Sequence, residues 1–159
     1  MKDPKYRYSP ARKFPAYVFV PGENAHPKKA GGHMEGLGDP VSAPINPQGP
    51  EESHDLRFGL DLYNFGYYWE SHVFFEALWN AHQREGSVAD LLKAFIKLGA
   101  AGVKDLIHQP KLAIEHRQRA RELLESVKKS EGDKFLGFDL QELIERDLTK
   151  SQRIDPSWN

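Results

Sequence analysis

Prolines divide this chain into two parts that must fold differently. Nine of the eleven prolines and six of the thirteen glycines lie in residues 1–50. Proline lacks the amide hydrogen that helices and central strands need, so this third cannot contain a long helix. Its aromatic and apolar residues are too numerous for a solvated linker, so we expect residues 1–54 to form an extended arm that lies partly against the rest of the chain. Within it, residues 16–20 (AYVFV) are predicted either to pair as a short strand or to dock as an extended segment.

Residues 55–159 show helical periodicity and are predicted to form one structural unit, an all-α bundle of four or five helices. Ser87 and Asp90 resemble a capping box at the start of the third helix, and Asp139 is predicted to cap the last one. Gly99 and Gly102 each cost roughly 1 kcal/mol inside a helix, so we expect another helix to pack closely against them. The expected helices cover about residues 56–64, 67–83, 87–107, 110–129 and 140–148.

Composition argues against several functions. The chain has 22 basic and 23 acidic residues and a net charge of -1, which predicts neither a nucleic-acid nor an acidic-membrane partner. The absence of cysteine excludes disulfides and thiolate metal sites, and it fits a reducing compartment. No apolar run approaches the ~20 residues needed to span a bilayer. We therefore expect a soluble, cytoplasmic protein, in which a homodimer would help to cover the many aromatic side chains.

Two ionisable residues lie within the most aromatic helix. His72 and Glu76 are one turn apart in the segment YYWESHVFFEALW, residues 67–79. Because aromatic residues flank them, we expect both to be buried, and a buried carboxylate must be paired, metal-bound or protonated. The pair is either an acid/base couple or a structural contact that seals a polar notch in the core. Glu70 points to the opposite side of the helix and is expected to bond to a neighbouring helix or to the arm.

Other histidines could extend this site. If His116, on the apolar stripe of the fourth helix, faces His72, the two imidazoles and Glu76 give a ligand set typical of zinc or iron. Otherwise His116 is a core histidine. His26 and His33, in the arm, are either incidental loop residues or residues presented to the same cleft.

The remaining histidines have simpler interpretations. His54 and His82 have no supporting neighbours in the sequence, so both are predicted to lie on the surface. His108 lies near the end of the third helix, where a basic residue interacts favourably with the helix dipole.

The run NFGYYWESHVFFEALW resembles the hallmark N-x-G-x-[YF]-[WF]-E-x-H-E-x-x-E-x-x-W of a prokaryotic, all-helical family called domain of unknown function 309. Val73 stands where that hallmark has a second glutamate. The segments LGAAGVK and HRQRARELL are similar to later parts of the family. The resemblance implies a helical bundle with a shared polar patch formed by Glu70, His72, Glu76 and Trp79, and it implies no particular reaction. The matching residues are Asn64, Gly66, Tyr68, Trp69, Glu70, His72, Glu76 and Trp79.

Two functions of different classes remain open. The first is a small-ligand or divalent-metal site with hydrolytic activity, in which His72 and Glu76 are catalytic and His72, Glu76 and His116 bind the metal. Its ligand-binding candidates are Glu70, Trp69, Trp79, His26 and His33. The second is a non-catalytic helical module, in which His72 and Glu76 are structural and the arm or an exposed aromatic patch recruits a protein partner.

Overall fold

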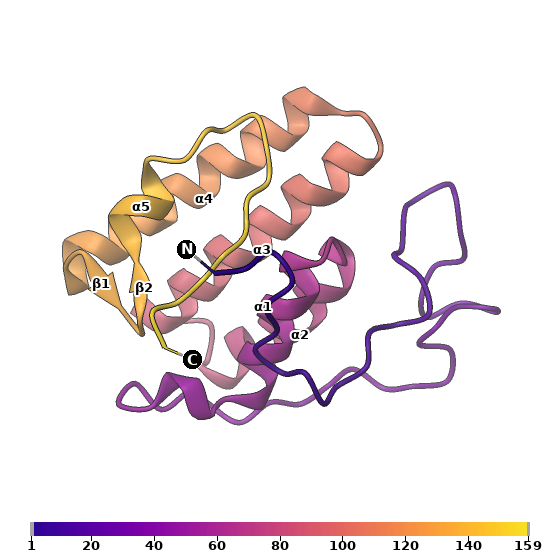
Figure 1. Cartoon of the computed structure of the whole chain (residues 1–159), viewed down its shortest axis with the longest axis horizontal. Coiled ribbons are helices and arrows are strands. Elements are labelled where there is room, and N and C mark those ends of the chain that lie inside the picture. Colours follow the sequence, from indigo (N-terminus) through magenta and orange to yellow (C-terminus); the bar gives the residue numbers. More distant parts are fainter. Residues whose placement is uncertain (1, 159) are drawn as a thin grey trace.

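Helices dominate the computed structural model, which describes residues 2–158 (Figure 1). The five α-helices pack against one another, so the predicted all-α bundle is confirmed. None of the helices in the described part of the chain combines the length and the apolar character that crossing a bilayer requires. In chain order, the elements are η1 (Pro50–Glu52), α1 (His54–Asn64), α2 (Tyr68–Ala81), α3 (Ser87–Leu106), α4 (Pro110–Glu131), β1 (Lys134–Phe135), β2 (Phe138–Asp139) and α5 (Leu140–Ile144).

Local side-chain chemistry sets several helix ends. The side chains of Ser53 and Asp139 each accept a hydrogen bond from a backbone N–H in the first turn of the helix that follows, α1 and α5 respectively. The predicted capping box of α3 is wrong, because the N-cap residue is Gly86 and no side chain caps the helix. Gly86 has a φ of 96°, which glycine adopts without a steric penalty. This conformation is not helical, so the helix begins at the next residue, Ser87.

Glycines let α2 and α3 approach closely, as predicted. A Cβ added at Gly102 would lie 2.4 Å from the ring Cγ of Tyr68, and one added at Gly99 would lie 3.2 Å from the Tyr68 carbonyl oxygen. Further along the pair, the rings of Phe75 and Phe95 are 5.5 Å apart. Tyr68 precedes Phe75 while Gly102 follows Phe95, so the two helices run antiparallel.

A short β-hairpin completes the core and was not predicted. Its two strands pair antiparallel, and the ring of Phe138 lies 5.0 Å from that of Phe95. The turn between the strands contains Leu136 and Gly137 with φ of 52° and 84°. Two consecutive positive φ angles suit the tight turn of a two-residue hairpin loop, but leucine gives no sequence signal for such a turn.

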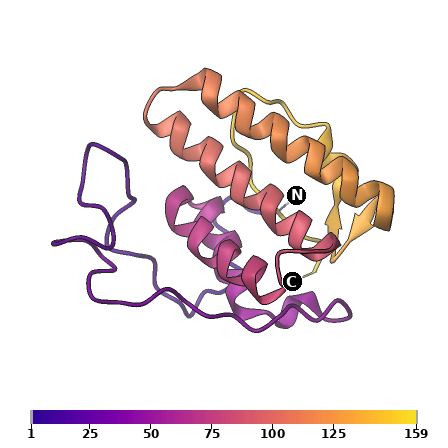
Figure 2. The same cartoon turned by 180° about the vertical axis from the view of Figure 1, so that it is seen from behind.

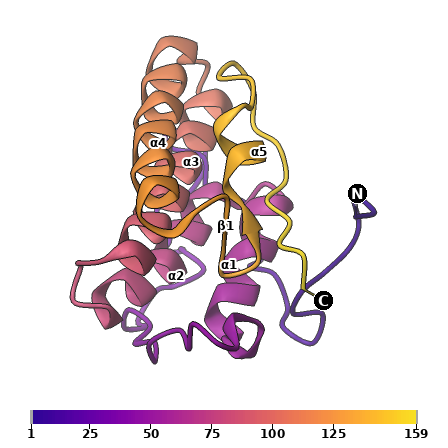
Figure 3. The same cartoon turned by 90° about the vertical axis from the view of Figure 1, so that its left-hand side faces the viewer.

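The last helix is shorter than predicted, because α5 ends at Ile144. Arg121 of α4 donates hydrogen bonds to the carbonyl oxygens of Ile144 and Arg146, at 2.8 and 2.7 Å. A neighbouring helix therefore supplies the hydrogen-bond donors for these carbonyls, so α5 can end here without leaving them unpaired. Figure 3 shows α5 and the chain that follows it along one side of the α3–α4 pair.

The N-terminal segment, residues 2–49, contains neither a helix nor a strand, and it loops outward beyond α1 and α2 before returning (Figures 1 and 2). Asp61 of α1 fixes the start of this segment. Its fully buried carboxylate accepts hydrogen bonds from the amides of Tyr8 and Ser9, at 2.7 and 2.8 Å, and from Nε of Arg7 at 2.9 Å. Because three donors satisfy this carboxylate, its burial is compatible with a stable fold.

The first residues also contact the C-terminal tail. The hydroxyl of Tyr8 donates a 2.6 Å hydrogen bond to Asp155, and Arg153 donates to the carbonyl oxygen of Tyr6 at 3.2 Å. Burial raises the pKa of Tyr8 well above its usual range, and the bond to Asp155 adds to this. Burial opposes ionisation of Asp155, but hydrogen bonds from Arg153 and Tyr8 outweigh it and lower the pKa of this carboxyl. The two ends of the chain are thus joined by a charge-assisted network.

Candidate functional site: a polar cleft beside α2

His72 and Glu76 lie at the edge of the bundle. Their side chains are 31% and 50% exposed, and Nε2 of His72 is 3.7 Å from Oε2 of Glu76. The prediction that aromatic rings bury both is wrong, because the aromatic residues of α2 lie on several faces: Phe75 is fully buried, whereas Trp69 is only half-buried. Even when His72 is protonated, an exposed i,i+4 ion pair contributes only about 0.3–0.5 kcal/mol to stability, so packing does not depend on it.

A backbone contact fixes the tautomer of His72. Its Nδ1 is 2.7 Å from the carbonyl oxygen of Trp69, and a carbonyl oxygen can only accept a hydrogen bond. The neutral ring therefore carries its proton on Nδ1, which leaves a free lone pair on Nε2. Nε2 and the carboxylate of Glu76 are then two acceptors that face each other, and they form an ion pair only when the imidazole is protonated.

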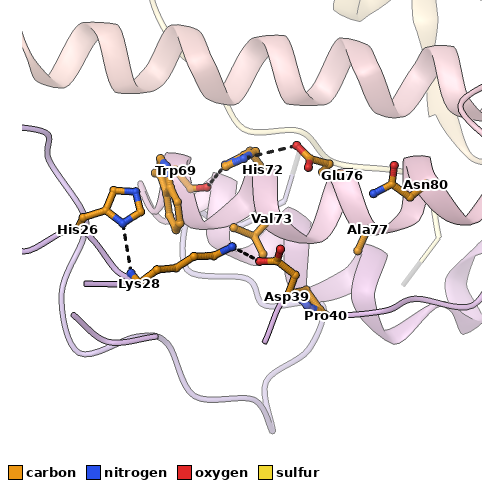
Figure 4. Close-up of a pocket in the computed structure, with 10 residues that line it drawn as sticks. All are labelled: His26, Lys28, Asp39, Pro40, Trp69, His72, Val73, Glu76, Ala77 and Asn80. Atoms are coloured by element: carbon orange, nitrogen blue, oxygen red, sulfur yellow. Dashed lines mark hydrogen bonds and ion pairs between the residues drawn. The ribbon is translucent and has the colours of Figure 1, made fainter. Parts of the chain in front are cut away.

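This pair opens onto a polar cleft between α2 and the N-terminal segment, with a volume of about 250 Å³ (Figure 4). Figure 4 shows the side chains of α2 along one wall and those of the N-terminal segment opposite. We call this hollow the polar cleft. Its lining residues are His26, Lys28, Asp39, Pro40, Trp69, His72, Val73, Glu76, Ala77 and Asn80.

Aromatic contacts hold the N-terminal wall of the cleft in place. The ring of Trp69 lies 5.3 Å from that of His26, 5.2 Å from that of His72 and 5.5 Å from that of Phe19, each edge to face. Nδ1 of His26 accepts a hydrogen bond from the amide of Lys28 at 3.2 Å. The neutral His26 ring therefore carries its proton on Nε2, the tautomer opposite to that of His72.

The polar cleft has one unbalanced charge. Lys28 and Asp39 form an ion pair with each other (Figure 4). When both histidines are neutral, the carboxylate of Glu76 has no cationic partner among the lining residues. A cationic hydrogen-bond donor would therefore complement the two acceptors at this point.

The sequence predicted that Glu76 is the buried carboxylate of α2, but the structure buries Glu70 instead. Its side chain is 3% exposed, and its Oε2 accepts hydrogen bonds from Nε2 of His33 at 2.8 Å and from the amide of Phe19 at 2.9 Å. Both donors belong to the N-terminal segment, so the prediction that Glu70 bonds to a neighbouring helix or to the arm is confirmed. Residues 16–20 do not form a strand, which was one of the two predicted alternatives; this stretch contacts α2 through Phe19.

Glu70 and His33 lie outside the lining of the polar cleft. The hydroxyl of Tyr17 accepts a 3.2 Å hydrogen bond from the amide of His33, and the two rings are 4.7 Å apart. The second oxygen of Glu70, Oε1, is buried without a hydrogen-bond partner within residues 2–158. This geometry is typical of a contact that fixes the N-terminal segment against α2.

Two other predicted site residues lie elsewhere. Trp79 packs against the core and contacts the side chains of Arg84 and Lys93. His116 lies half-buried on α4, where burial lowers its pKa and the charges of Lys97 and Lys104 lower it further.

The structure does not assemble the predicted metal ligands. Within residues 2–158, no group of three or more His, Cys, Asp and Glu side chains is arranged to hold a metal ion. His72, Glu76 and His116 therefore do not converge as the zinc or iron ligand set that the sequence suggested.

Residues 56–115 match a protein family described as Domain of unknown function (DUF309). These residues resemble the DUF309 domain. The predicted resemblance is confirmed over this range, which covers most of α1, all of α2 and α3, and the start of α4. No curated protein and no solved structure matches the chain.

The region that matches DUF309 supplies only one wall of the polar cleft. Trp69, His72, Glu76 and Asn80 lie inside the matched range, whereas the N-terminal residues of the lining precede it. The spacing of His72, Glu76 and Asn80 at i, i+4 and i+8 could have identified Asn80 from the sequence. Nothing in the aperiodic N-terminal segment could have identified Lys28 or Asp39.

His82 was also missed. Its Nε2 accepts a 2.9 Å hydrogen bond from the amide of Ile45, and burial lowers its pKa. The prediction that His82 is a surface histidine is wrong, because its ring is half-buried and its partner comes from a part of the chain 37 residues away. Together with Glu70, His82 fastens the N-terminal segment to α2 and its C-terminal end.

Proposed function

We propose that the polar cleft binds a small organic amine, with the ammonium group held between Nε2 of His72 and the carboxylate of Glu76. The proposal rests on one observation: these two acceptors face each other, with Nε2 of His72 3.7 Å from Oε2 of Glu76. None of the residues that line the polar cleft places a hydrogen-bond donor between them. An ammonium group has three donors and a positive charge, so it can satisfy both acceptors and balance the charge of Glu76. Trp69 offers an aromatic ring that attracts the cation further.

The volume of the polar cleft supports a small ligand. About 250 Å³ is near the lower end of ordinary ligand sites, which suits a molecule with few non-hydrogen atoms. Asn80 and the Nε2–H of His26 provide polar groups that can orient such a ligand. The proposal therefore limits both the charge and the size of what binds.

The same two residues support base chemistry. A free Nε2 lone pair can take a proton from bound water or from a ligand donor, and Glu76 would then pair with the imidazolium. Hydrolysis is the reaction class that this arrangement favours. The structural role suggested for His72 and Glu76 has no comparable support, because both side chains are partly exposed.

Titration with n-butylamine at pH 8 tests the proposal, because at this pH the amine is charged and unperturbed histidines are mostly neutral. Binding is followed through the imidazole NMR signals of His72, with n-butyrate as the ligand of opposite charge. We expect butylamine to bind and Glu76→Gln to weaken binding at least tenfold, while the exposed α4 control Glu115→Gln leaves it unchanged. Absence of binding, or equal affinity in Glu76→Gln, would refute the proposal.

A further inference from the structure

A second hollow, of about 240 Å³, lies between α2 and α3. Ile96, Ala100 and Val103 follow one face of α3 at i, i+4 and i+7, and with Tyr68 and Trp69 of α2 they give it an apolar wall. We call this hollow the apolar groove. A wall of this composition suits a hydrocarbon group, because burying apolar surface is favourable and burying unpaired polar groups is costly.

The apolar groove and the polar cleft meet at two residues. Trp69 and His72 line both hollows, and their rings are in contact with centroids 5.2 Å apart. A head group held at Nε2 of His72 therefore lies at the border of the apolar groove. Any tail that leaves this head group on the α3 side meets apolar side chains.

Charge restricts the far part of such a ligand. Lys104 also lines the apolar groove, and its ammonium group disfavours a second cation nearby. The aliphatic stem of Lys104 can still cover a hydrocarbon tail. The groove therefore suits a molecule with a single positive charge at the head group.

We infer that the polar cleft and the apolar groove together bind a monoamine with a hydrocarbon tail of about four to six carbons. The ammonium group lies between His72 and Glu76, and the tail lies against Ala100 and Val103. The inference rests on the proposed function, because it uses the same head-group contacts. It adds the chain-length dependence and the selection against diamines.

The test compares n-butylamine, n-hexylamine and 1,6-diaminohexane by calorimetric titration of the full chain at pH 8. A fully buried methylene strengthens binding about fourfold. Because the groove is open on one side, we expect hexylamine to bind about fourfold more tightly than butylamine for its two extra methylenes. The diamine should bind more weakly than hexylamine, since its second charge approaches Lys104.

Matched leucine variants locate the tail. Ala100→Leu fills the apolar groove and should abolish the advantage of hexylamine over butylamine. Ser126→Leu adds the same side chain at an exposed position of α4 and should preserve the advantage.

The outcomes separate this inference from the proposed function. Equal affinities for butylamine and hexylamine, or a chain-length advantage that survives Ala100→Leu, would overturn the tail site while leaving the amine site in place. Failure of all three amines to bind would overturn both. A dimer that Ala100→Leu dissociates, with no chain-length dependence, would assign the groove to a second copy of the chain and would also overturn the inference.

Discussion

Replacing Glu70 by alanine should release the N-terminal segment from α2. The substitution removes the common acceptor of two buried donors, Nε2–H of His33 and the amide of Phe19. Each buried donor left without a partner costs about 1–3 kcal/mol, and breaking a buried charged contact costs about 3–5 kcal/mol. Water can reach the released segment and lower this cost, so we expect about 3 kcal/mol less stability against local opening.

Native-state hydrogen exchange at the amide of His33 measures this opening. The acceptor of this amide is the hydroxyl of Tyr17, so the substitution does not remove its own hydrogen bond. A loss of about 3 kcal/mol corresponds to exchange roughly 100-fold faster than in the wild type. Glu76→Ala is the matched control on the same helix and should change exchange less than about twofold, since the contact of Glu76 with His72 is exposed.

Two results would refute this reasoning. Unchanged exchange in Glu70→Ala would show that the buried hydrogen bonds do not hold the segment. Equal acceleration in Glu70→Ala and Glu76→Ala would show that the two carboxylates of α2 do not differ in role.

Two further predictions concern packing and pH. Gly102→Ala should lower the free energy of unfolding in urea by about 1–3 kcal/mol, because the new Cβ overlaps the ring of Tyr68. The control Gly38→Ala, whose Cβ would have no atom within 4 Å, should change the free energy of unfolding by less than about 0.5 kcal/mol. Similar values for the two variants would contradict the close contact between α2 and α3. Burial lowers the pKa of His82 in the folded state, so as pH falls the unfolded chain binds the proton first. The contribution of His82 to stability is therefore complete above pH 6.5 and is lost as pH falls through the folded pKa. His82→Gln keeps an acceptor for the amide of Ile45 but does not titrate, so its loss of stability between pH 7.5 and pH 5 should be smaller than that of the wild type, and an equal loss would contradict the prediction.

Periodic parts of the sequence predicted the fold well. Apolar positions recurring at helical spacing gave all five helices, and Gly99 and Gly102 gave the close contact of α2 with α3. Ends of helices were less predictable, because they depend on tertiary partners. Arg121 pairs the carbonyl of Ile144 where α5 stops, and the sequence around Ile144 alone contains no sign of this contact.

Burial along α2 was the main error in predicting the site. A helix with aromatic residues on several faces gives no clear buried side, so spacing alone could not decide which glutamate enters the core. Glu70 is buried because two donors from the N-terminal segment reach it, and Glu76 is exposed because the segment leaves a cleft there. The N-terminal segment, which has no periodicity, therefore determines which glutamate of α2 is buried.

The protonation pattern of His72 is the basis of the proposed site. Long-range ¹H–¹⁵N NMR of the imidazole above pH 7.5 identifies the protonated nitrogen directly. The hydrogen bond to the carbonyl oxygen of Trp69 predicts a proton on Nδ1 and a free lone pair on Nε2. A neutral ring that carries its proton on Nε2 would remove the acceptor that faces Glu76 and would contradict the amine site.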